Sequence, residues 1–154
     1  MAVFHLSAQI IGRSTGRSTV AAAAYRSGGR LVDAGSGMAF DYTRKTGVIH
    51  SAVLLPAGAP DRLADRELLW NEVEAFERRK DAQLAREIEL ALPRELPDAV
   101  NIALVRAYVQ DEFVARGMIA DLNVHKPVGP DGLARPHAHV LLTMRSVGEA
   151  GFGP

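Results

Sequence analysis

No cysteine occurs among the 154 residues, which excludes disulfide bonds, thiolate metal ligands and cysteine nucleophiles. Long apolar runs are also lacking: none approaches the roughly 20 residues that a helix needs to cross a bilayer. The N-terminus has no basic start followed by an apolar centre, as a signal peptide would. The net charge is zero at pH 7, which argues against a generic nucleic-acid binder. These absences predict a cytoplasmic protein, and the length is that of one domain with a real core.

The neutral total conceals an uneven distribution of charge. Residues 1–50 hold six basic side chains against two acidic ones, whereas residues 61–100 hold eleven acidic side chains against seven basic ones. A basic N-terminal third in a neutral chain indicates one side that faces phosphate and another that faces solvent.

The pattern of apolar residues predicts both strands and helices. Alternation with period 2 predicts strands over residues 2–11, 84–92, 119–125 and 137–144, and a hairpin or two short strands within 33–55. Helical spacing predicts three helices, one following Ser18 and ending at Gly28 and Gly29, one over 61–82, and one from about Pro97 to Arg116. Strands with one apolar face and intervening helices favour an α+β sandwich, an antiparallel sheet with helices packed on its apolar face.

Three of the five histidines gather near the C-terminus. His137 and His139 are two residues apart in a strand and therefore point to the same face. His125 ends the preceding strand, and the Pro- and Gly-rich segment between them predicts a chain reversal that brings all three together. Three neutral imidazoles form a metal site with open coordination positions, as in catalytic centres. His5 and His50 remain, and both are interpreted as structural or surface residues.

The histidines share their sheet face with other polar residues, and this face is interpreted as the working face. Its predicted members are His5, Ser7, Gln9, Glu87, Glu89, Asp121, Asn123, His125, His137 and His139. Strand geometry allows Glu87, Glu89 or Asp121 to be the acid that supports the metal-binding histidines.

Tyr25 projects from a slim helix that contains four consecutive alanines. A helical tyrosine is ordinarily a core residue, but here a metal site and Arg26 would favour the phenolate. Attack by such a tyrosine on a phosphodiester would leave a covalent phosphotyrosine. The residues therefore suggest metal-assisted phosphoryl transfer.

Four stretches carry a resemblance to a known family. They are AVFHLSAQIIGRSTGRSTVAAAAYRSG, DYTRKTGVIH, VEAFERRKDAQLAREIELALPREL, and NVH followed by PHAHVLLTMR. With them the chain resembles the relaxase domain of the MobA/MobL family of conjugative mobilisation proteins, within the class of HUH single-strand endonucleases. The resemblance implies that Tyr25 is the nucleophile, that His125, His137 and His139 bind the metal, and that Glu87 supports a histidine.

The resemblance also implies the fold, the activity and the partners. The sheet would be a relaxase palm with ferredoxin-like elements. The activity would be a site- and strand-specific nick at the nic site of a plasmid origin of transfer, through a 5'-phosphotyrosyl intermediate that is later rejoined. Residues 1–147 would be the nicking domain, and residues 148–154 the start of a linker to an absent, helicase-type region. Expected partners are single-stranded origin DNA, relaxosome accessory proteins and a type IV secretion coupling protein, for a monomer that is not inserted in a membrane.

The expected ion follows from the same resemblance, and the expected DNA contacts are basic residues around the tyrosine helix and in the turn near residue 44. Mn²⁺ or Mg²⁺ is the expected ion, although three imidazoles also suit Zn²⁺, Ni²⁺ or Co²⁺. The predicted DNA-binding residues are Arg13, Arg17, Arg26, Arg30, Arg44 and Lys45. Tyr42 or Trp70 could stack on bases, with Trp70 favoured as a core residue.

Two other functions stay open from the residues alone. One is a three-histidine metal hydrolase or oxygenase that acts on a small molecule, with Tyr25 in the core. The other is a non-catalytic DNA-binding module whose histidines hold a structural ion. Both leave the tyrosine without a role.

Overall fold

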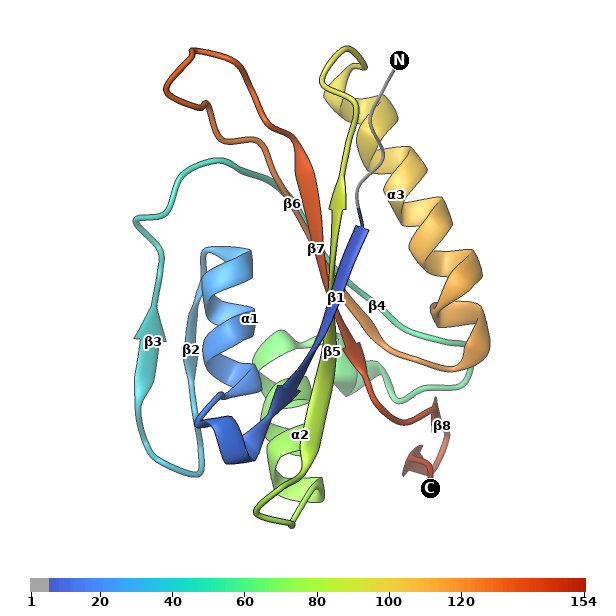
Figure 1. Cartoon of the computed structure of the whole chain (residues 1–154). Coiled ribbons are helices and arrows are strands. Elements are labelled where there is room, and N and C mark those ends of the chain that lie inside the picture. Colours follow the sequence, from blue (N-terminus) through green and yellow to red (C-terminus); the bar gives the residue numbers. More distant parts are fainter. Residues whose placement is uncertain (1–5) are drawn as a thin grey trace.

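A five-stranded antiparallel sheet runs through the centre of the molecule, as the computed structural model of the chain shows for residues 6–154 (Figure 1). The strand order is β1-β5-β7-β6-β4, and every neighbouring pair is antiparallel. The strands are β1 (Leu6–Gly12), β4 (Val48–Leu54), β5 (Gln83–Ala91), β6 (Ala120–His125) and β7 (His137–Thr143). The predicted antiparallel α+β fold is confirmed. The first residues of the predicted N-terminal strand, His5 included, lie outside the described part of the chain.

Three helices accompany the sheet: α1 (Thr19–Ser27), α2 (Arg66–Phe76) and α3 (Asp98–Glu112). The Ser18 hydroxyl caps α1 by accepting from the Ala21 N–H at 3.2 Å, and the Asp65 carboxylate caps α2 in the same way. Gly28 ends α1 with a φ of 67°, which glycine adopts without strain. The second helix is shorter than predicted, because a separate turn covers Asp61–Ala64 and the helix ends at Phe76.

The helices cover both faces of the sheet, with α1 and α2 on one side and α3 on the other (Figure 1). The prediction of helices on one face only was therefore wrong. Ile11, Ala85 and Leu141 lie on the histidine face and are completely buried. Because these residues make one end of that face apolar, α1 and α2 can pack there and leave the histidine end open.

The β2–β3 hairpin lies against α1, outside the main sheet. It consists of β2 (Arg30–Val32) and β3 (Ala39–Asp41), which pair antiparallel. Of the two arrangements expected within 33–55, a hairpin or two short strands, β3 and the strand that follows it do not form a hairpin with each other. Instead β4 pairs with β6, and the hairpin becomes an arm beside the tyrosine helix.

The last residues fold onto the domain. β8 (Val147–Gly148) and β9 (Gly151–Phe152) form a small hairpin, and the Phe152 ring lies 5.4 Å from the Phe76 ring of α2. The predicted boundary after residue 147 therefore falls within a folded element. Among the helices of residues 6–154, none has both the length and the apolarity that a membrane span requires.

Candidate metal centre and tyrosine site

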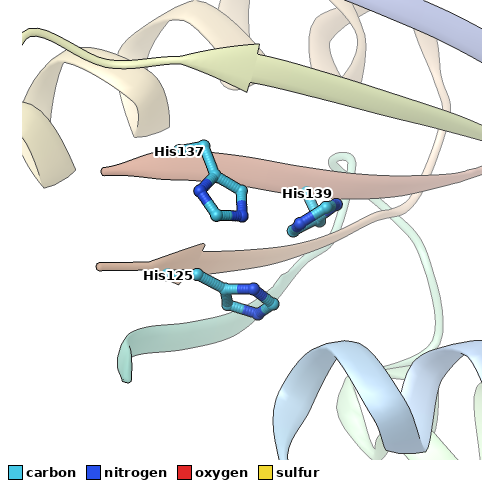
Figure 2. Close-up of side chains that lie close together, drawn as sticks. All are labelled: His125, His137 and His139. Carbon is cyan, nitrogen blue, oxygen red and sulfur yellow. The ribbon is translucent and has the colours of Figure 1, made fainter. Parts of the chain in front are cut away.

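The three histidines of β6 and β7 meet at one end of the sheet. His125 is directly opposite His137 in the β6–β7 register, and His139 is two residues further along β7. One ligand nitrogen from each residue can be chosen so that all three lie within 4.8 Å of one another. Figure 2 shows the rings gathered on the same side of the strands. Metal–imidazole bonds of about 2.0–2.1 Å put neighbouring ligand nitrogens about 3–3.5 Å apart, so the three rings would have to draw closer together to share one ion.

Burial keeps two of these imidazoles neutral. It lowers the pKa of His125 to about 4, against an opposing hydrogen bond from this ring to the Arg26 carbonyl. Burial, with nearby positive groups led by Arg26, lowers the pKa of His139 to about 2. A neutral imidazole has the lone pair that a metal requires, so this donor set fits a divalent ion.

Main-chain carbonyls orient the rings of His125 and His137. His125 donates from Nε2 to the Arg26 carbonyl at 2.6 Å, and His137 donates from Nδ1 to the Arg135 carbonyl at 2.9 Å. Because a carbonyl only accepts, the opposite nitrogen of each neutral ring keeps its lone pair. The His125 bond also ties the histidine cluster to the residue that follows Tyr25.

Glu87 is the carboxylate beside His139. Its Oε1 lies 3.8 Å from His139 Nδ1, a buried nitrogen without a hydrogen-bond partner among residues 6–154. Glu87 is 3% exposed and also pairs with Arg26, with Arg17 at 3.2 Å and with Gln9 at 3.2 Å. Glu87 thus lies between His139 of β7 and two arginines of the tyrosine helix region, Arg17 just before α1 and Arg26 near its end.

The other two predicted acids do not contact His139 in this way. Asp121 is completely buried and accepts from Arg66 Nε at 2.9 Å, Trp70 Nε1 at 2.9 Å and Asn123 Nδ2 at 3.0 Å. It therefore links β6 to α2 and does not reach the histidines. Glu89 is exposed and lines the cavity in front of them.

Tyr25 and the histidines line the same cavity. This histidine cavity measures about 370 Å³, and its walls include Tyr25, Arg26, Lys45, Glu89, His125, His137 and His139. Tyr25 is 44% exposed. The structure thus brings the predicted nucleophile and the predicted metal ligands to one place.

Lys45 and Tyr42 hold the tyrosine from two sides. The Lys45 ammonium lies 3.7 Å from the centre of the Tyr25 ring and donates to the Tyr25 carbonyl at 2.9 Å. The Tyr42 ring meets the Tyr25 ring edge-on at 5.2 Å. Burial, together with the neighbouring Arg26, lowers the pKa of Lys45.

The predicted DNA-binding residues divide into three groups. Arg17, Arg26 and Lys45 lie around Tyr25, and Arg30 and Arg44 are exposed on or after the hairpin. Arg13 is used differently, because its guanidinium donates to the carbonyls of Glu74 at 2.8 Å and Arg79 at 3.0 Å, and to that of Glu77. It caps the C-terminal end of α2.

Sequence reasoning missed a second cavity on the other side of Tyr25. This hairpin cavity, of about 580 Å³, lies between α1 and the β2–β3 hairpin. Met38 and Phe40 of the hairpin line it, but no sequence signal marks them, because their importance depends on where the hairpin packs.

The fold and the site define an antiparallel α+β domain with a candidate metal centre beside a helical tyrosine. Comparison with known families narrows this description: the model of the MobA/MobL family matches residues 17–154. The chain therefore belongs to the MobA/MobL family, as its motifs had indicated.

Individual relatives agree with this assignment. The chain is 44% identical to the conjugal transfer protein TraA of Rhizobium radiobacter over 99% of its own length, but covers 14% of that protein. It is 47% identical to the mobilization protein MobL of Acidithiobacillus ferridurans, over 82% of this chain and 33% of the relative.

A solved structure matches the fold closely. It comes from work on the molecular basis of vancomycin resistance transfer in Staphylococcus aureus, and superimposes with a TM-score of 0.91 at 36% identity. The match covers 99% of this chain and 76% of the other.

Proposed function

We propose that this domain is a DNA relaxase that nicks one strand at the nic site of a plasmid origin of transfer and later rejoins it. The observation that carries the proposal is the histidine cavity, in which Tyr25 and three histidines face the same space. Membership of the MobA/MobL family, and relatives named for conjugal transfer and mobilization, support the biological setting.

In the proposed reaction the Tyr25 oxygen attacks the scissile phosphorus. The Tyr25 hydroxyl loses its proton to water as a bond forms between its oxygen and phosphorus. The bond from phosphorus to the 3' oxygen breaks, and the 3' oxygen takes up a proton from water. The product is a 5'-phosphotyrosyl strand and a free 3'-OH. Because the phosphoester bond is exchanged and not hydrolysed, attack by the 3'-OH reverses the step and restores the strand.

Each neighbouring residue has a proposed part in this step. His125, His137 and His139 would hold a divalent ion, with Mn²⁺ or Mg²⁺ proposed and Zn²⁺, Ni²⁺ or Co²⁺ as possible occupants. Such an ion would polarise the phosphate and stabilise its developing charge. Glu87 positions His139, and Lys45 holds the Tyr25 ring and attracts the phosphate.

The remaining proposals concern the cellular setting. The domain would act in the cytoplasm as a monomer on single-stranded origin DNA. Relaxosome accessory proteins and a type IV secretion coupling protein would be its partners. The chain spans about one seventh of the TraA relatives, so unwinding is not assigned to it.

The test is a covalent-adduct assay. The chain is incubated with Mn²⁺ or with EDTA and a labelled single-stranded oligonucleotide spanning the cognate origin, and the products are separated in SDS. We expect a metal-dependent, SDS-resistant adduct that disappears in Tyr25→Phe. Cleavage without an adduct would instead indicate water activation by a metal hydrolase, and binding without cleavage would indicate a DNA-binding module.

A further inference from the structure

The hairpin cavity and the histidine cavity share Tyr25 and Arg26 as walls. Tyr25 therefore stands between two hollows, of which the proposed reaction uses only one. At about 580 Å³, the hairpin cavity has the size of typical small-ligand sites. A DNA strand whose phosphate lies at Tyr25 continues in both directions from that phosphate. One of the two flanking nucleotides could therefore occupy the hairpin cavity.

The walls of the hairpin cavity suit a nucleobase. Its α1 side is formed by Ala21 and Ala22, whose methyl groups leave room for a flat group close to the helix. On the hairpin side, Met38 and Phe40 both line the cavity. Met38 is 57% exposed, and a thioether or an aromatic ring can pack on the face of any base.

The charge at the mouth of this cavity suits the phosphate that accompanies a base. The Arg17 and Arg26 side chains both line the cavity, and both are held by ion pairs with Glu87. An apolar floor beside two fixed guanidinium groups matches a base attached to a phosphate.

The chemistry of the step decides which nucleotide lies there. In an in-line displacement the attacking and leaving oxygens are on opposite sides of phosphorus. The nucleotide that leaves as the 3'-OH end is therefore directed away from Tyr25, whereas the nucleotide that keeps the phosphate becomes bonded to it. The cavity that adjoins Tyr25 on its other side is placed for the nucleotide that stays.

We propose that the hairpin cavity binds the base of the first nucleotide on the 3' side of the nick, which carries the phosphotyrosyl bond. This inference rests on the proposed function and adds a binding site to it. The site holds the covalently attached end in register, so that a 3'-OH can return to the same phosphorus and rejoin the strand.

The test measures coupling between a change in the protein and a change in the DNA. Binding is measured in the Tyr25→Phe background, which prevents cleavage, with Ala21→Leu added to fill the cavity. Leucine retains a high helix propensity at this position. Ala39→Leu is the matched control, because Ala39 is exposed, does not line the cavity and points to the opposite face of β3 from Phe40.

Three origin oligonucleotides are compared: intact, abasic at the first nucleotide 3' of the nick, and abasic at the nucleotide 5' of it. We expect the 3' abasic site to weaken binding about tenfold, as for loss of one stacked base. Ala21→Leu should weaken binding of intact DNA similarly and show no further loss with the 3' abasic strand. Ala39→Leu should behave like the parent.

Other outcomes overturn the assignment. If the losses of affinity from Ala21→Leu and from the 3' abasic site multiply, Ala21 and the 3' base act separately. If Ala21→Leu shows no further loss with the 5' abasic strand instead, the cavity binds the nucleotide on the 5' side. Met38→Ala, a change at an exposed position, repeats the test without filling the cavity. An SDS-resistant adduct formed by the parent chain establishes the proposed function independently. Its absence with every origin sequence would overturn both proposals.

Discussion

At the scale of single residues, Glu87 is the acid best placed to act on the histidines. Its carboxylate lies beside His139 Nδ1 and holds Arg17 and Arg26. Carboxylates in such positions orient the imidazole and raise its basicity toward a metal. Glu89 faces the same cavity but is exposed, so solvent screens its charge.

The change Glu87→Gln should therefore weaken metal binding more than Glu89→Gln does. We expect Mn²⁺ affinity, measured by calorimetry, to fall about 10–100-fold in Glu87→Gln, the usual range for loss of such a carboxylate. Glu89→Gln serves as the control and should remain close to the parent. Equal losses in the two variants would contradict a specific role for Glu87.

Lys45 is predicted to position the nucleophile. Lys45→Met removes both the contact with the Tyr25 ring and the hydrogen bond to its carbonyl. A cation–π contact contributes about 0.5–2 kcal/mol, so the single-turnover cleavage rate at saturating DNA should fall roughly tenfold. Mn²⁺ affinity should not fall, because Lys45 is a positive neighbour of His125 and His139 and not a ligand.

Two further variants test whether Lys45 acts by positioning the Tyr25 ring or only through its positive charge. Lys45→Arg should recover part of the rate, because a guanidinium also binds an aromatic face. Arg44→Met removes an exposed neighbouring charge and should change DNA affinity more than the rate. A rate loss of the same size in Arg44→Met would show that only local positive charge matters.

The sequence predicted some of these residues and not others, for a physical reason. The grouping of His125, His137 and His139 depends on strand alternation and one short chain reversal, which are local. The partners of Arg13 and Asp121 are distant: Arg13 reaches Glu74, 61 residues away, and Asp121 reaches Arg66, 55 residues away. A local pattern holds no information about such contacts.

At the scale of elements, α1 is fastened to the sheet by polar contacts on the histidine side. The Arg26 carbonyl accepts from His125, while the Arg17 and Arg26 side chains meet Glu87. These contacts set the distance between the tyrosine helix and the histidine strands. Packing of the completely buried Ala23 and Ala24 against the core fixes the other side of the helix.

The link between α2 and β6 is predicted to stabilise the fold without serving the metal. Asp121→Ala would leave the Arg66 guanidinium and the buried Trp70 N–H without their shared acceptor. Breaking a buried pair in this way costs about 3–5 kcal/mol of unfolding free energy. Urea unfolding followed by the fluorescence of the single tryptophan measures the loss.

The control for this prediction is Glu72→Gln, which breaks an exposed pair with Arg62. It should cost no more than about 1 kcal/mol. Mn²⁺ affinity of folded Asp121→Ala should match the parent. A large fall in metal affinity, with stability unchanged, would return Asp121 to the metal site.

Strands and helices could be predicted from the sequence where the pattern of apolar residues ran without interruption. Strands with strict alternation, such as β6 and β7, were placed almost to the residue. The pairing of β2, β3 and β4 was harder to predict, because these short segments carry similar β-forming residues. Only tertiary packing decides which of them pair. The same holds for α2, whose end depends on capping by Arg13 from a distant loop.

At the scale of the whole molecule, the buried neutral histidines make stability depend on pH. In an unfolded chain histidine has a pKa near 6.5, whereas burial lowers the pKa of His125 to about 4 and that of His139 to about 2. Burial also lowers the pKa of His50, which accepts from Arg106 on the other face of the sheet. At a pH between a histidine's pKa in the folded chain and its pKa in the unfolded chain, the unfolded chain binds more protons than the folded one.

The metal-free domain should therefore lose stability as the pH falls. The contribution of these histidines is fully present above about pH 6.5 and is progressively lost as the pH drops, toward about 4 for His125 and toward about 2 for His139. Urea unfolding at pH 7.5, 6 and 5 should give a falling free energy, and the double variant His125→Asn, His139→Asn should reduce this pH dependence while His50 retains its share. If the double variant kept the full pH dependence, the two histidines would not be buried in the neutral form that metal binding needs.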